Sequence, residues 1–186
     1  MPIEFLATAI PDVKLVVSLR IQDSRGFFSE TYRRSEFASA GLPQHFVQEN
    51  HSLSVEQNTV RGLHYQTHPF AQDKLIRVVR GRIFDVAVDL RASSPTYGKY
   101  VCAELSAENW QQLFVPIGFA HGFCTLESNT EVVYKVTNYY SRDHDFGIAW
   151  NDPNIGIKWP INEAEAILSD KDKVQPRLAE VGPVFD

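Results

Sequence analysis

Residues that can transfer protons or stabilise charge are spread through the 186-residue sequence, and none of them defines a reaction alone. His64 could be a general base, a metal ligand or a hydrogen-bonded structural histidine, and the structural role is usual for a lone histidine. Lys74 and Arg77 would most often be solvated, whereas Tyr134 lies on an apolar strand face where most tyrosines belong to the core. Asp172 would most often be surface charge or a helix cap. A proton-transfer site is therefore one hypothesis, and an ordinary polar surface is the other.

The histidine spacing argues against a metal site. On a β-barrel, a metal would be expected to bind a His-x-His pair with a carboxylate a few residues further on. His64 is followed by His68 instead of a histidine two positions on, and His121 has no acidic residue at metal-ligand spacing. We therefore expect no bound metal.

Residues 60–91 contain the strand signals that would position His64 and Lys74. Two sets of side chains alternate along the second predicted strand: Phe84, Val86, Val88 and Leu90 on one face, and Asp85, Ala87, Asp89 and Arg91 on the other. This alternation is typical of a half-buried strand. Gly81-Arg82 predicts a tight turn that joins it to the preceding strand as a β-hairpin. Such a rigid frame suits a polar site, although a plain hairpin with a solvated basic face has the same pattern.

The other predicted strands are short and separated by turn residues. They cover residues 13–21, 26–32, 46–51, 100–105, 110–116, 123–126 and 131–140. A short helix is predicted over 33–40, ended by Gly41, and two glycines predict a sharp turn around His121. About ten short strands with little helix predict an all-β sandwich or barrel, and a single jelly roll over residues 1–186 fits the length.

Charge and composition exclude some classes of function. The net charge of −5 argues against general nucleic-acid binding. The first residues have neither a basic region nor an apolar run typical of a signal peptide, and no stretch approaches the ~20 apolar residues of a membrane span. We therefore expect a cytoplasmic protein. Cys102 and Cys124 lie in apolar, strand-like surroundings, which predicts buried free thiols instead of a disulfide or a metal site.

The order of ten short motifs resembles that of the dTDP-4-dehydrorhamnose 3,5-epimerase family. The motifs are Asp23-Ser-Arg-Gly-Phe-Phe28, Arg61-Gly-Leu-His-Tyr-Gln66, Lys74-Leu-Ile-Arg77, Asp85-Val-Ala-Val-Asp-Leu-Arg91, Ser94-Pro-Thr-Tyr-Gly98, Pro116-Ile-Gly-Phe-Ala-His-Gly-Phe123, Tyr134-Lys135, Trp150-Asn-Asp-Pro153, Ile157-Lys-Trp-Pro160 and Ser169-Asp-Lys-Asp172. Each motif is weakly specific, but their order is maintained over about residues 13–178.

The resemblance implies a cupin-type jelly roll with a few short helices that forms homodimers and needs no metal or organic cofactor. It also implies an activity: inversion of C3 and C5 of dTDP-4-dehydro-6-deoxy-D-glucose, which gives dTDP-4-dehydro-L-rhamnose. The C4 ketone acidifies the protons on the neighbouring carbons. Inversion then requires a base on one face of the sugar, an acid on the other, and a group that holds the enolate oxygen.

The resemblance also implies catalytic roles. His64 would be the base and Asp172 its orienting partner, and positioned proton transfer of this kind contributes typically 10²–10⁴-fold. Lys74 would stabilise the enolate oxygen, a role in which loss of one donor costs ~3–4 kcal/mol. Tyr134 would return the proton from the opposite face, although a barrel interior also accommodates a purely structural tyrosine.

Further residues would bind the nucleotide and the sugar by the same resemblance. Arg61 and, from the neighbouring subunit, Arg25 would contact the pyrophosphate and nucleotide, because a guanidinium binds phosphate oxygens in pairs. The remaining substrate-binding positions are Phe28, Glu30, Gln48, Glu49, Asn50, His121, Tyr140, Asp145 and Lys171. Phe28 or Tyr140 would stack on thymine. Asp145 stands where glutamate is common, which leaves its contact with the substrate open, and Arg91 fits a structural role equally well.

The sequence leaves three alternative functions open. A single-centre relative, inverting C3 or C5 in another deoxysugar pathway, would share the His-Asp pair and the nucleotide contacts. A non-catalytic cupin that binds sugar nucleotides would need no base–acid pair, so His64→Asn would leave its function intact. A metal-dependent cupin oxygenase would contain a metal that elemental analysis of the purified protein would detect.

Overall fold

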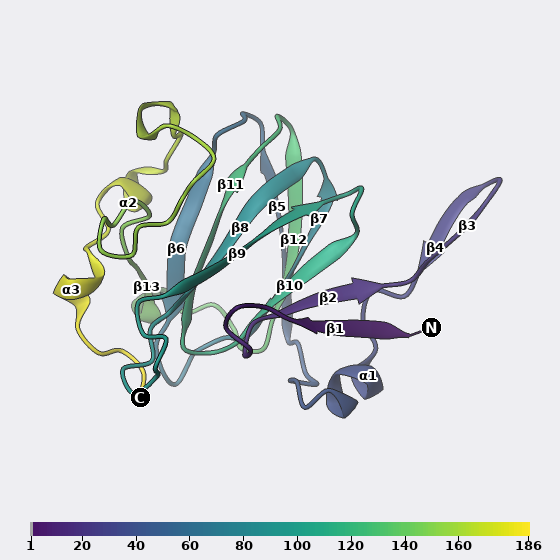
Figure 1. Cartoon of the computed structure of the whole chain (residues 1–186), viewed down its shortest axis with the longest axis horizontal. Coiled ribbons are helices and arrows are strands. Elements are labelled where there is room, and N and C mark those ends of the chain that lie inside the picture. Colours follow the sequence, from purple (N-terminus) through teal and green to yellow (C-terminus); the bar gives the residue numbers. More distant parts are fainter. Residues whose placement is uncertain (1) are drawn as a thin grey trace.

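The computed structural model describes residues 2–186, whose strands form two facing antiparallel β-sheets and a separate hairpin (Figure 1). The first sheet contains, in spatial order, β1 (Ile3–Ala7), β2 (Lys14–Ser18), β10 (Gln111–Val115), β7 (Lys74–Arg80), β12 (Thr130–Val136) and β5 (Gln48–Ser54). The second contains β13 (Asp145–Gly147), β6 (Val60–Gln66), β11 (Phe119–Thr125), β8 (Arg82–Asp89) and β9 (Tyr100–Ser106). The architecture is the predicted all-β jelly roll with a few short helices.

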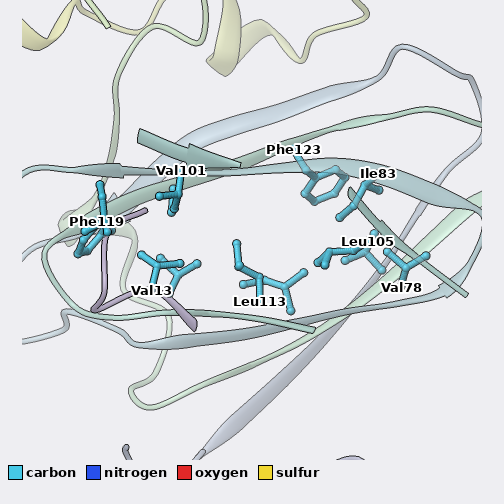
Figure 2. Close-up of a cluster of buried hydrophobic side chains, with 13 residues drawn as sticks. Val13, Val78, Ile83, Val101, Leu105, Leu113, Phe119 and Phe123 are labelled. Carbon is cyan, nitrogen blue, oxygen red and sulfur yellow. The ribbon is translucent and has the colours of Figure 1, made fainter. Parts of the chain in front are cut away.

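The main hydrophobic core lies between the two sheets. Figure 2 shows part of it: Val13, Val78, Ile83, Val101, Leu105, Leu113, Phe119 and Phe123. These side chains are almost completely buried, and burial of each stabilises the fold by about 1.5–3 kcal/mol before the entropy cost of ordering. The core holds the two sheets against each other and leaves room for polar side chains elsewhere between them.

Strand β8 is buried on both faces, so the prediction of a half-buried strand is wrong. Val86 and Val88 pack in a second cluster beneath C-terminal residues that include Leu178 and Phe185. The opposite face, which carries Asp85, points between the sheets together with Ala87 of the main core. C-terminal residues therefore cover the face of β8 that carries Val86 and Val88. The face that carries Asp85 is buried as well, so neither face is exposed to solvent.

The predicted β7–β8 hairpin is also wrong. β7 pairs with β10 and β12, whereas β8 pairs with β9 and β11. The chain crosses from one sheet to the other at Gly81, whose φ is +76°. A Cβ atom there would lie 2.4 Å from Thr130 Oγ1, so the crossover requires glycine for both its backbone conformation and its space.

Strand β11 continues through His121, where a sharp turn is predicted. The turn lies earlier, at Gly118 with φ +94°. Gly122 instead permits close packing of strands, because a Cβ there would lie 2.6 Å from the Arg61 carbonyl oxygen. His121 is consequently held on a regular strand, directly opposite His64 of β6.

Helices are few and short. α1 (Arg34–Ser39) confirms the predicted helix and ends before Gly41, whose φ is +71°. The others are α2 (Asp170–Lys173) and α3 (Leu178–Val181), with 3₁₀ turns at Arg142–His144 and Glu163–Glu165. Within residues 2–186, no helix is long and apolar enough to cross a membrane.

The remaining differences from the predicted elements are local. The strand expected over 13–21 divides into β2 and β3, and β1 and β13 are not predicted. Cys102 is exposed on β9, contrary to expectation, while Cys124 is buried; both are free thiols.

β3 (Arg20–Asp23) and β4 (Gly26–Ser29) form a hairpin that projects away from the two sheets (Figure 1). We call it the arm. Its Ile21, Phe27 and Phe28 side chains are exposed, and Phe28 keeps 68% of its surface. A protruding hairpin with exposed large apolar side chains is typical of a surface that contacts another chain.

Candidate active site

A cavity between the sheets contains most of the predicted site residues. It consists of two adjoining lobes of about 430 and 250 Å³ that share His64, Lys74 and Tyr134. The larger lobe is also lined by Ser52, Thr59, Val60, Arg61, His121, Phe123, Ile167, Leu168, Ser169 and Asp172. The smaller is also lined by Gln48, Asn50, Tyr65, Gln66, Gln72, Tyr140, Asp145 and Lys171.

His64 is hydrogen-bonded to a buried carboxylate. Its Nε2 atom lies 2.5 Å from Asp172 Oδ1, and Asp172 is only 5% exposed. Asp172 lies in the first turn of α2, which Ser169 caps, and the Ser169 hydroxyl donates to Asp172 Oδ2 at 2.8 Å. Burial opposes ionisation of Asp172, but its hydrogen bonds to His64 and Ser169 outweigh burial and lower its pKa. The ionised carboxylate fixes the imidazole orientation and leaves Nδ1 for the cavity.

Lys74 supplies a cation to the same cavity. It is the first residue of β7, and its Nζ donates to the His64 carbonyl oxygen at 3.4 Å. Burial lowers the pKa of Lys74 to about 8. A partly desolvated ammonium group interacts strongly with an anion that forms beside it, because little water screens the pair.

Tyr134 lies on the sheet opposite His64. It belongs to β12, where its backbone is in register with Asn50 of β5 and Ile76 of β7. Burial raises the pKa of Tyr134, so the phenol keeps its proton over the physiological range. The cavity therefore presents an imidazole from one wall and a phenol from the other.

Arg61 lies at the edge of the larger lobe. Its guanidinium donates to Ser54 Oγ and to the Leu53 carbonyl oxygen, both at 3.1 Å. Neither acceptor is a carboxylate, so the positive charge of Arg61 is available to an anionic ligand. Nearby, the buried hydroxyl of Ser52 has no hydrogen-bond partner among the residues that the structure describes.

The smaller lobe is closed on one side by three residues from different segments. Asp145 Oδ2 accepts hydrogen bonds from Lys171 Nζ at 2.5 Å and from the Tyr140 hydroxyl at 3.1 Å. Tyr140 remains 57% exposed, which leaves surface of its ring for a flat ligand. The Gln48 side chain accepts from the Tyr140 backbone N–H and donates to Asn50.

Four predicted binding residues do not line this cavity. Arg25 is at the tip of the arm, where it pairs with Asp23 at 2.6 Å, and Phe28 is exposed on the same arm. Glu30 pairs with Arg33. The Glu49 side chain lies on the face of β5 away from the cavity, where it pairs with Lys135. Within one chain, the arm residues cannot complete the site. Arg91 is also outside the cavity, where it binds Asp89 and Asp12.

Sequence reasoning missed several polar residues in or beside the site, among them Ser169, Ser52 and Asp85. Ser169 had a detectable signal, because Ser-Asp-Lys-Asp is the pattern of a helix N-cap. Ser52 had none in the sequence. Asp85, which accepts a hydrogen bond from His121 Nε2 at 2.7 Å, was assigned to the polar side of a half-exposed strand. Among residues 2–186, no group of three or more His, Cys, Asp or Glu side chains could hold a metal ion.

The arrangement suits proton abstraction next to a carbonyl group. A carboxylate-oriented imidazole can take a proton, a buried phenol can give one from the opposite wall, and an ammonium group can hold the oxyanion between them. An anion-binding arginine and an exposed aromatic ring flank this centre. These flanking groups fit a substrate with a charged linker and a flat base.

Comparisons with known proteins agree with this chemistry. A family model described as dTDP-4-dehydrorhamnose 3,5-epimerase matches residues 7–180. The chain is 52% identical over 181 residues to the protein of that name from Sinorhizobium fredii NGR234, covering 97% of this chain and 92% of the relative. The crystal structure of a Bacillus anthracis protein of the same name, with TDP and PPi bound, matches with a TM-score of 0.91 and 48% identity, covering 95% of this chain and 99% of that chain. A Legionella pneumophila dTDP-6-deoxy-D-glucose-3,5-epimerase in complex with dTDP-4-keto-L-rhamnose matches with a TM-score of 0.93 and 38% identity over 100% of both chains.

Proposed function

Because the chain belongs to the dTDP-4-dehydrorhamnose 3,5-epimerase family, we propose that it inverts C3 and C5 of dTDP-4-dehydro-6-deoxy-D-glucose. The product is dTDP-4-dehydro-L-rhamnose. One observation carries the proposal: His64 and Tyr134 reach the same cavity from opposite sheets, with Lys74 beside them. Inversion at a carbon requires this two-sided arrangement, whereas ligand binding alone does not.

The proposed reaction starts when His64 removes the proton from a carbon next to the C4 ketone. The electron pair of the broken C–H bond moves onto the ketone oxygen, and Lys74 stabilises the resulting enolate. Tyr134 then donates its proton to the opposite face of the same carbon, which inverts the centre. A proton returns from the imidazolium to the tyrosinate through solvent before the second carbon reacts.

Asp172 acts through His64 in this scheme. Its carboxylate holds Nε2, so Nδ1 is the nitrogen that accepts the substrate proton, and its negative charge stabilises the imidazolium that forms. The neighbouring Ser169 hydroxyl holds the second carboxylate oxygen and limits rotation of the Asp172 side chain.

The nucleotide would occupy the positive and aromatic edges of the cavity. Arg61 would bind the pyrophosphate, because it has no carboxylate partner of its own. Tyr140 would stack on thymine, with Gln48 and Asn50 contacting the base or sugar. Asp145 contacts Tyr140 and Lys171, so we assign it the role of holding that edge in place.

We further propose that the active unit is a homodimer in which the arm completes the neighbouring site. Arg25 and Phe28 lie on the arm and do not line the cavity of their own chain, and the arm has exposed apolar side chains. Insertion of the arm into a second copy would bury Phe28 and bring the Arg25 charge to the pyrophosphate. A cytoplasmic location stays a prediction, which cell fractionation would test.

A coupled assay tests the proposed function against a non-catalytic role. The protein is incubated with dTDP-4-dehydro-6-deoxy-D-glucose, and the L-lyxo product is trapped by a reductase. The proposal requires product from the native enzyme and a loss of roughly 10²–10⁴-fold in His64→Asn, with dTDP affinity largely kept. Equal product formation by the two proteins would exclude His64 as the base.

A further inference from the structure

A second histidine–aspartate pair lies beside the first. His121 of β11 is in register with His64 of β6, and its Nε2 lies 2.7 Å from Asp85 Oδ1. Asp85 is on the next strand, β8, two residues from the direct partner of His121, so the contact is a diagonal one across neighbouring strands. The two imidazoles therefore stand side by side on one wall of the cavity, each with its own carboxylate.

The burial of Asp85 has no structural explanation. Its side chain is 0% exposed, and its Oδ2 atom has no hydrogen-bond partner in the described residues. Removing a carboxylate from water without satisfying both oxygens costs several kcal/mol. An apolar side chain of similar size would be cheaper between two sheets, so retention of Asp85 points to a role in function.

Asp89, on the same strand, is a buried carboxylate with a structural role and serves for comparison. It is also 0% exposed, but it accepts hydrogen bonds from Arg91, Ser94 and Thr96. Both of its oxygens are satisfied, and it ties together a loop outside the cavity. Asp85 has one partner only, and that partner is a residue of the site.

The nitrogen atoms of His121 have different surroundings. Nε2 is occupied by Asp85, whereas no hydrogen bond within residues 2–186 uses Nδ1. His121 lines the larger lobe together with Lys74 and is 7% exposed. Because Nε2 lies against Asp85, Nδ1 is the atom available to a ligand, and a protonated Nδ1 would donate to an oxyanion.

We propose that Asp85 is a positioning residue that holds His121 through Nε2, so that Nδ1 joins Lys74 as a second donor to the enolate oxygen. This inference rests on the proposed function and deepens it: the oxyanion is bound by two donors instead of one. The charge that both donors stabilise exists only after proton removal, so the contribution falls on the chemical step more than on binding. Asp85 also partly offsets the burial that lowers the pKa of Lys74, which favours the charged form of the first donor.

The test uses the near-isosteric variant Asp85→Asn, in which the side-chain oxygen still accepts from Nε2 but the negative charge is gone. We expect kcat to fall about 10–100-fold, with KM and the dTDP dissociation constant changed less than about 3-fold. The decisive comparison is a double-mutant cycle with His121→Ala. If Asp85 acts through His121, Asp85→Asn lowers kcat by less than about 3-fold in the His121→Ala background. Equal losses in both backgrounds would overturn the proposal.

Asp89→Asn is the matched control, because it removes a buried charge from the same strand outside the cavity. We expect it to lower stability and to leave kcat of the folded enzyme unchanged. A selective loss of kcat in this control would show that the effect of Asp85→Asn is not specific to the site.

Nitrogen-15 NMR of the histidine rings tests the positioning step without any variant or turnover. The proposal requires His121 to carry protons on both ring nitrogens, because Nε2 donates to Asp85 and Nδ1 donates to the oxyanion. Absence of the proton from either nitrogen would overturn it. If the native protein showed no epimerisation, the proposed function would fail while this spectrum still reported whether Asp85 orients His121.

Discussion

Lys74 illustrates, at the scale of single residues, how the site is built at the expense of stability. A buried ammonium group is costly, and the lowered pKa of about 8 measures that cost. The hydrophobic environment that penalises the cation also prevents water from weakening its interaction with an enolate. Function and folding therefore place opposite demands on this side chain.

Replacing Lys74 by methionine is accordingly expected to stabilise the protein and abolish most of its activity. The native pKa of about 8 is below the ordinary value of 10.5, so below pH 8 both folded and unfolded chains hold the proton and the folded state bears the full cost. As pH rises from 8 to 10.5, the folded state releases the proton first, and the cost disappears. Lys74→Met should gain about 1–3 kcal/mol at pH 7 and little at pH 10.5, measured by urea denaturation. Destabilisation at pH 7 would contradict this reasoning.

The pH dependence of catalysis should show the titration of Lys74. If Lys74 must be charged to hold the enolate, kcat/KM of the native enzyme falls above pH about 8. In Lys74→Arg the remaining activity should not fall in this range, because a guanidinium stays protonated. A profile for the native enzyme that is flat to pH 10 would remove Lys74 from the electrostatic role.

At the scale of elements, the decisive feature is that strands from different sheets bring their polar residues to one cavity. β6 and β11 supply the two histidines, β7 supplies Lys74 and β12 supplies Tyr134. α2 adds Asp172 from outside the sheets. The short α2 is only one turn long, and Ser169 caps it.

Ser169→Ala tests that support. The hydroxyl caps α2 and donates to Asp172, so its loss should lower the free energy of unfolding by about 0.5–2 kcal/mol. We also expect kcat to fall about 3–10-fold, because Asp172 loses one of the hydrogen bonds that hold it against His64. Ser169→Thr keeps the hydroxyl and is the matched control. Unchanged kcat in Ser169→Ala would show that the Asp172 side chain keeps its position against His64 without the Ser169 hydroxyl.

The sequence predicts where strands and helices lie better than it predicts which strands pair with each other. Strand alternation around Tyr134 and the Gly41 end of α1 are local signals, and both appear in the structure. The sheet to which a strand belongs is not local, so the crossover at Gly81 looked like a hairpin. For a related reason, the alternation pattern predicts that Asp85 lies on the polar face of a half-buried strand. Residues near the C-terminus cover the face of that strand opposite Asp85, and strand alternation does not predict this contact.

At the scale of the whole molecule, one chain brings the proposed catalytic residues together but leaves its arm outside the cavity. The residues predicted from resemblance divide accordingly: His64, Lys74, Tyr134 and Asp172 meet in the cavity, whereas Arg25 remains at the tip of the arm. Apart from the resemblance, Gly26-Phe-Phe28 is the sequence feature that indicates contact between chains, because it looks like a strand that another chain could accept.

Mixing two inactive variants tests the role of the arm. Arg25→Ala lacks the arm charge and His64→Asn lacks the base. If Arg25 acts on the neighbouring site, each mixed dimer contains one complete site, and an equal mixture refolded together should recover about a quarter of native activity at low substrate concentration. The same mixture kept as separate dimers is the control. No recovery, despite mixed dimers shown by mass spectrometry, would place Arg25 in the site of its own chain or outside any site.

The central claim is that a base and an acid act from opposite walls on both carbons next to the ketone. Proton NMR of dTDP-4-dehydro-6-deoxy-D-glucose incubated with the enzyme in D₂O tests it most directly. The native protein should introduce deuterium at C3 and at C5 with inversion. Tyr134→Phe should still exchange these protons through His64 but invert them roughly 10²–10⁴-fold more slowly. Exchange by the native protein at only one carbon would indicate a single-centre epimerase, and exchange at neither would contradict the account.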